Sequence, residues 1–187
     1  MRLTKEALKS RLVIFLLGMM ATGITGPLIA HEDEPDKDAS ADAMLSAEAR
    51  QVVDTLNAYA AAVQSTNLET ISDYMVTDAG FSSIEGTFTD LGWQSYRDHL
   101  APEMAMFQDT QYQLSDIRPY VSGDMAYASF DYAMEVTVVS EQFEGGKHPV
   151  SMRGKGTVIL VRDGEDWKIR HMHTVTEREE NPGETTH

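Results

Sequence analysis

The sequence predicts an α+β domain with about three N-terminal helices packed on one face of a curved, mostly antiparallel sheet. Between residues 46 and 104, apolar residues recur every three or four positions, which is the period of a helix with one buried face. After residue 110, long β-branched and aromatic runs alternate with turn residues, which is typical of consecutive strands. Helices followed by a meander of strands favour this class.

The first 44 residues are expected to lie outside the domain. Residues 1–30 have the pattern of a signal peptide: a basic start, an apolar run over 12–21, then small residues up to Ala30. A retained anchor is the alternative, because the stretch counted to Ala30 just reaches across a bilayer. Residues 31–44 predict a disordered acidic linker, and 179–187 a disordered tail. We therefore expect a periplasmic or secreted protein with its domain at 45–178.

The charge of the chain limits its partners. Its 187 residues carry a net charge of −15, and removal of residues 1–30 changes this to −18. Such a surface repels nucleic acid phosphates and anionic lipid headgroups, so we expect no nucleic-acid partner and no stable membrane insertion after cleavage. The chain has no cysteine, so its fold depends on its hydrophobic core alone.

Capping residues set the expected helix starts. Ser46 is a good N-cap for the first helix, and Asn67 and Asp90 can cap the second and third. Pro102 must kink or end the third helix, because proline lacks the amide hydrogen that its turn requires. The strongest helical signal is the apolar stripe of the first helix, formed by Ala49, Val52, Val53, Leu56, Tyr59, Ala60 and Val63.

The expected strands follow these helices, apart from a short one at Phe81–Glu85 between the second and third. Tight-turn residues at Asp163–Asp166 predict a hairpin, and Gly145 with Gly146 marks another turn. The long strands are expected at Tyr112–Val121, Met125–Val139, Val150–Val161 and Trp167–Thr176.

The last hairpin predicts a ligand pocket. With its loop centred between residues 164 and 165, Arg162 faces Trp167, and Gly156 faces His173. Strand alternation then places His171 and His173 on one inward face, with glycines leaving space beside them. Alternatively, both imidazoles hydrogen-bond within the core. His-x-His could also share a metal ion, but no third ligand has a recognisable spacing, so we predict no metal and no cofactor.

The ending of the chain resembles SnoaL-like domains of the nuclear transport factor 2-like superfamily, and is similar to the association domain of calcium/calmodulin-dependent kinase. The resemblance implies a cone-shaped fold with a pocket between helices and sheet, and a homodimer through the outer face of the sheet. The family often has Ser two places after the last His, where this chain has Val175. The residues that carry the resemblance are Asp163, Gly164, Trp167, Ile169, His171 and His173.

A resemblance to ketosteroid isomerases implies three catalytic candidates. Tyr59, eight residues before Asn67, matches the family's oxyanion donor on the first helix. Glu85 lies about two positions from the place of the general base, and Asp131 is the match for a second donor. Structural roles are the alternative, with Tyr59 in the core, Glu85 solvated and Asp131 paired with a base across the sheet.

We expect His171, His173, Tyr74, Trp93 and Trp167 to line a ligand site, although aromatic residues at helical spacing are also typical of a core. The sequence therefore predicts an exported domain that binds a small apolar or amphipathic molecule. Two alternatives are a cofactor-independent isomerase, dehydratase or cyclase, and an oligomerisation domain with a vestigial pocket.

Overall fold

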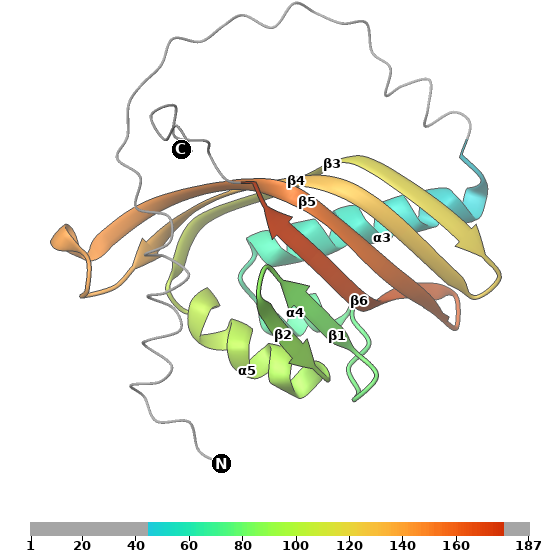
Figure 1. Ribbon diagram of the computed structural model, residues 1–187, viewed down its shortest axis with the longest axis horizontal. Coiled ribbons are helices and arrows are strands. Elements are labelled where there is room, and N and C mark those ends of the chain that lie inside the picture. The colour runs from blue at the N-terminus through green and yellow to red at the C-terminus, as the bar shows by residue number, and fades with distance from the viewer. Residues whose placement is uncertain (1–44, 178–187) are drawn as a thin grey trace, which may run out of the picture. The chain divides into compact units, whose positions relative to one another are not determined.

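The computed structural model describes residues 45–177, so the expected signal peptide, linker and tail lie outside the described residues. Within residues 45–177, three α-helices and one six-stranded sheet form the predicted α+β arrangement. The long strands curve, and the first described helix lies along their concave side (Figure 1). None of the helices in this range is long and apolar enough to span a membrane.

The first two helices begin where the capping residues predict. Helix α3 (Ala47–Gln64) has Ser46 as its N-cap, whose Oγ accepts a hydrogen bond from the Ala49 amide at 3.1 Å. Helix α4 (Leu68–Ser72) follows Asn67, whose side chain caps its first amides. The predicted stripe of α3 is buried against the sheet through Ala49, Val52, Leu56, Tyr59, Ala60 and Val63.

Helix α5 (Trp93–Met104) starts later than the sequence predicts. Asp90 does not cap it, because that residue belongs to a strand, β2 (Phe88–Leu91), which the sequence analysis does not predict. Asp90 instead contacts the first turn of α5 by accepting a hydrogen bond from Ser95 Oγ at 2.6 Å. Strand β2 forms because the chain turns back after β1 (Ser82–Glu85) and pairs with it antiparallel.

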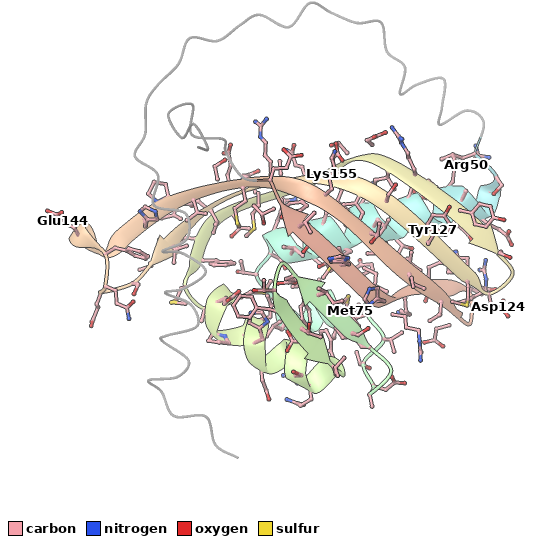
Figure 2. All side chains as sticks on the ribbon, in the orientation of Figure 1. Arg50, Met75, Asp124, Tyr127, Glu144 and Lys155 are labelled. Carbon is pink, nitrogen blue, oxygen red and sulfur yellow. The ribbon has the colours of Figure 1, made fainter. Side chains whose placement is uncertain are left out.

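The strands follow the order β2-β1-β6-β5-β4-β3. Only the β1–β6 pair is parallel among the described strands, which confirms the mostly antiparallel sheet. A short 3-10 turn (η1, Glu144–Gly146) joins β4 to β5, and Figure 2 labels Glu144 at this tip. The four long strands are β3 (Phe107–Ser122), β4 (Met125–Val139), β5 (Lys147–Asp163) and β6 (Asp166–Thr176).

The hairpin between β5 and β6 has the predicted turn. Asp163 pairs with Asp166, and Arg162 with Trp167, as the loop position predicts. Gly164 has a φ of 65°, a conformation that glycine adopts without steric cost.

The register of β6 changes beyond this turn. Up to Ile169 the inward side is as predicted, but from His171 onward the pairs are shifted by one residue. Arg170 is therefore the extra residue of a β-bulge, and every later side chain points to the other face. The bulge lies where β6 changes its neighbour, because Ile169 bridges to Met75 whereas His171 begins the pairing with β1.

The core lies between α3 and the concave face of the sheet. Its largest fully buried side chains come from both layers, and include Val52, Leu56, Ile71, Phe81, Phe130, Val138, Val158, Leu160 and Ile169.

Candidate acid–base site

A group of hydroxyls and one carboxyl meets inside the fold, beside the apolar core. Tyr59 comes from α3, Glu85 from the end of β1 and Tyr96 from α5. Tyr112 and Tyr132 come from β3 and β4. Because five elements contribute one side chain each, the site exists only in the folded chain. Burial raises the pKa of each tyrosine, and the charge of Glu85 raises it further.

Tyr59 is a buried hydrogen-bond donor. Only 4% of its surface is exposed, and its hydroxyl donates to the Met172 sulfur at 3.7 Å. The Tyr96 hydroxyl interacts with that of Tyr59, which lowers the pKa of Tyr59 against the larger effects of its surroundings. Burial raises the pKa of Tyr59, and the charge of Glu85 raises it further. Tyr59 therefore keeps its proton at neutral pH and can donate a hydrogen bond to a ligand oxygen.

Glu85 is a half-buried carboxyl. Its oxygen Oε1 accepts a hydrogen bond from Ser83 Oγ at 3.4 Å, and its backbone pairs in parallel with Thr174. Burial raises the pKa of Glu85, the positive charge of His99 lowers it, and nearby carboxylates raise it again. A carboxyl with a raised pKa next to a neutral tyrosine is an arrangement suited to general acid–base chemistry.

His99 on α5 adjoins this site, and the sequence analysis assigns it no role there. Its Nδ1 lies 2.8 Å from Asp90 Oδ2, and its Nε2 lies 3.4 Å from Glu103 Oε1. The hydrogen bond with Glu103 raises the pKa of His99 to about 9, against the opposing effect of burial and with help from Asp90. The spacing of His99 and Glu103, four residues apart on a helix, was the signal available in the sequence.

Tyr132 on β4 and Thr176 on β6 add two further hydroxyls to the inner face of the sheet. Their hydroxyls lie 2.9 Å apart, and the Tyr132 ring centre lies 6.1 Å from that of Tyr112. Tyr132 is half-buried, and burial raises its pKa. The sequence analysis does not predict either residue, because they come from two strands that meet only through β5.

Asp131 does not belong to this site, so its assignment as a second donor is wrong. Alternation along β4 points Phe130 and Tyr132 inward and Asp131 outward. Its carboxylate accepts a hydrogen bond from Lys155 Nζ at 2.9 Å, which is the structural alternative considered for it. That hydrogen bond raises the pKa of Lys155, and Figure 2 labels Lys155 on the side of the sheet away from α3.

The predicted inward placement of His171 and His173 is also wrong. Because of the bulge at Arg170, Met172 points inward and both histidines point to the outer face. His171 is half-buried, and its Nδ1 lies 2.8 Å from Ser82 Oγ, whereas His173 is exposed.

The space predicted beside the two glycines is filled by aromatic rings. A Cβ on Gly156 would lie 2.3 Å from Phe130 Cζ, and a Cβ on Gly154 would lie 2.8 Å from the Tyr132 ring. Both glycines are inward and buried, as predicted, but each accommodates the side chain of its cross-strand partner. The glycines therefore allow close packing of β4 on β5, and they do not leave a ligand space.

The three predicted aromatic ligand residues are mainly core residues. Trp93 is buried and meets the Phe81 ring edge to face at 6.0 Å, and it also contacts Tyr96. Trp167 is buried under the Arg162 guanidinium, which lies 4.3 Å from its ring centre. Tyr74 is half-buried, and its carbonyl pairs with the backbone of β6. Of the three, Trp93 alone adjoins the acid–base group, through Tyr96.

Two open depressions of about 440 Å³ each lie on the described part of the surface. One lies along α4 and the start of α5, and the other on the outer face beside Lys155 and His173. Neither is lined by Tyr59 or Glu85. Among residues 45–177, no three His, Asp or Glu side chains converge as a metal ion would require.

Comparison with known proteins identifies the family. The fold is that of the nuclear transport factor 2-like (NTF2-like) superfamily. A family model described as SnoaL-like domain matches residues 52–174, so the chain belongs to the SnoaL-like domain family. A search of curated protein sequences gave no match.

Solved structures share this fold at low sequence identity. An NTF2-like superfamily protein from Salmonella enterica has a TM-score of 0.61 and 16% identity, covering 73% of this chain and 96% of that one. A candidate dehydratase of the NTF2-like family from Streptomyces avermitilis has a TM-score of 0.60, 21% identity and coverage of 71% and 97%. A ketosteroid isomerase-like protein from Erwinia carotovora has a TM-score of 0.57, 14% identity and coverage of 72% and 100%.

Proposed function

We propose that this SnoaL-like domain catalyses a cofactor-independent isomerisation or dehydration of a small, mainly apolar molecule that carries a carbonyl or hydroxyl oxygen. Glu85 removes a proton from the carbon next to the ligand carbonyl. Tyr59 donates its hydrogen bond to the oxygen on which negative charge develops. In an isomerisation the proton on Glu85 returns to another carbon of the same molecule. In a dehydration Glu85 passes it to the departing hydroxyl, which leaves as water as its bond to carbon breaks, so neither reaction consumes a cofactor.

The observation that carries this proposal is the approach of Tyr59 to Glu85 on the inner face. The Tyr59 hydroxyl contacts Met172, which pairs with Ser83 across the sheet, and Ser83 donates a hydrogen bond to Glu85. The surrounding core residues would hold the apolar part of the ligand. The solved structures described as a candidate dehydratase and a ketosteroid isomerase-like protein support the same class.

Binding without catalysis is the second candidate. It is favoured by the state of the Tyr59 hydroxyl, which already donates a hydrogen bond to the Met172 sulfur. A ligand oxygen must replace the sulfur as acceptor, and this exchange suits a binding pocket as well as an active site.

Exchange of ligand protons with solvent separates the two candidates. A panel of cyclic ketones in D₂O is followed by NMR, with the wild-type protein, Glu85→Gln and Tyr59→Phe. Catalysis predicts exchange that falls about 100-fold or more in Glu85→Gln, and that stays unchanged in Glu165→Gln, a turn residue exposed to solvent. Exchange at the same rate in Glu85→Gln would contradict the assignment of the base. Ligand-induced shifts of Tyr59 signals without any exchange would favour binding alone.

We also propose that the protein is exported and forms a homodimer through the outer face of its sheet. Exposed apolar side chains on that face support the dimer: Tyr120 and Tyr127 stack with ring centres 5.4 Å apart, and Met125 lies nearby at 52% exposed. Val175 is exposed on the same face. The signal-peptide pattern of residues 1–30 supports export.

A further inference from the structure

His99 contacts the half-buried carboxylates Asp90 and Glu103 on the side of the fold where Glu85 lies, and the proposed reaction does not use it directly. We propose that His99 is a positioning residue whose imidazolium, held by Asp90 and Glu103, serves as the counter-charge that keeps Glu85 ionised inside the fold. This inference rests on the proposed role of Glu85 as base. It assigns no contact between His99 and the substrate.

The hairpin of β1 and β2 brings the acidic partners to one face. Ser83 pairs with Asp90 and Glu85 with Phe88, and residues paired across antiparallel strands share a face. The Phe88 ring centre lies 6.1 Å from that of His99, so this is the face on which α5 packs. Glu85 and Asp90 therefore meet His99 from the same side.

A hydrogen bond with Asp90 and an ion pair with Glu103 hold the imidazole at its two nitrogens. Asp90 Oδ2 lies 2.8 Å from Nδ1, while Asp90 Oδ1 accepts from Ser95 Oγ at 2.6 Å. Glu103 Oε1 lies 3.4 Å from Nε2. An imidazole with a carboxylate at each nitrogen is a donor at both positions and carries a positive charge. The pKa of about 9 for His99, raised chiefly by the hydrogen bond with Glu103, agrees with this state at neutral pH.

Of the described groups that act on the Glu85 carboxyl, His99 is the one that carries a positive charge. The groups that act on its carboxyl are Asp90 from β2, Glu103 and His99 from α5, and Ser83 from its own strand. Tyr59, Tyr96, Tyr112 and Tyr132 complete the surroundings from α3, α5, β3 and β4, and all are neutral at this pH. Among these described groups His99 alone is basic. Its side chain is 28% exposed, so it exchanges protons with solvent.

The experiment compares His99→Gln with His173→Gln, which removes an exposed imidazole from the opposite face. Carbon-13 NMR follows the titration of the Glu85 carboxyl in each full-length variant, without any substrate. We expect Glu85 to titrate at a higher pH in His99→Gln than in wild type, and to be unchanged in His173→Gln. An unchanged Glu85 titration in His99→Gln would overturn the proposal, whatever activity the protein has.

Two further measurements test the proposal if His99→Gln does not fold correctly or has a structural defect. In Glu85→Gln, where His99 is intact, the imidazole should titrate at a lower pH than in wild type, and an unshifted titration would overturn the coupling. Where ketone exchange is observed, His99→Gln should lower kcat/KM about tenfold near pH 6, with recovery at high pH and little change in KM. Loss at all pH values alike would show a merely structural role. Absence of exchange in the wild type would contradict the proposed reaction, while the two NMR titrations still decide the role of His99.

Discussion

The ring of Phe130 lies across Gly156 on the neighbouring strand, so closely that a Cβ at residue 156 would stand 2.3 Å from Phe130 Cζ. We therefore expect Gly156→Ala to lower the free energy of unfolding by about 1–3 kcal/mol, because the ring must move within a packed core. Urea unfolding measures this loss. Adding Phe130→Leu to Gly156→Ala should recover part of it, since the smaller side chain leaves room for the methyl group.

Gly154 provides the matched control. There the nearest atom to an added Cβ is the Val175 carbonyl oxygen at 2.1 Å, and the Tyr132 ring comes second. Tyr132→Leu should therefore fail to rescue Gly154→Ala, because the backbone of β6 cannot withdraw as a side chain can. Equal rescue at both glycines would contradict this prediction, because it would show that the Tyr132 ring limits the space at residue 154 and that the β6 backbone does not.

Glu85→Gln should stabilise the protein at neutral pH by about 1 kcal/mol while removing the proposed activity. The folded-state pKa of Glu85 is raised above its ordinary value of 4.5, chiefly by burial. The contribution of Glu85 to the free energy of unfolding is therefore fully present below pH 4.5, and it is lost as the pH rises through the folded-state pKa. Urea unfolding at pH about 4 and about 7 should show the variant gaining only at the higher pH.

The turn residue Glu165 is the control for this prediction, because its carboxyl is exposed. Glu165→Gln should leave the free energy of unfolding within about 0.5 kcal/mol of wild type at both pH values. A Glu85→Gln protein that is less stable than wild type at neutral pH would mean that the ionised carboxyl stabilises the fold.

His99 should make stability fall as the solution becomes alkaline. Its pKa is raised from 6.5 to about 9, so its stabilising contribution is complete below pH 6.5 and is lost as the pH rises through about 9. Because the side chain is partly exposed, we expect this contribution to be about 1–2 kcal/mol. The midpoint temperature of thermal unfolding should fall more between these pH values for wild type and His173→Gln than for His99→Gln. An equal fall in all three proteins would contradict the prediction.

The proposed dimer predicts that a charged substitution on the outer face of the sheet weakens dimerisation. Sedimentation at tens of micromolar should give a dimer for wild type, and Tyr127→Lys should shift it toward monomer, because a charge would be buried among apolar side chains. Gln51→Lys, on the exposed side of α3, should stay dimeric. A monomeric wild type would reject the dimer.

Export predicts a shortened chain in the native host. N-terminal sequencing of the purified protein should begin between Ile24 and Asp33, which brackets cleavage after Gly23 and after Ala30. An intact Met1 on soluble cytoplasmic protein would contradict export.

Local patterns in the sequence predicted the helices, the long strands and the last turn, because each depends on neighbouring residues. Ser46 caps α3 as expected, and Arg162 faces Trp167 across the predicted turn. Tyr59 and Glu85 were named by resemblance, and their catalytic roles stay a prediction. Strand β2 was missed, since four residues are too few to set a period and its pairing with β1 defines it.

The sequence by itself thus determined the class of fold and the position of most of its elements. Tertiary structure alone decided which way the histidines point, because the bulge at Arg170 arises where β6 passes from residue 75 to β1. It also decided that His99 lies near Glu85, since α5 must pack on the β1–β2 hairpin, which no local sequence pattern predicts. Periodicity describes one element at a time, whereas a register shift and a shared charge depend on pairs of elements.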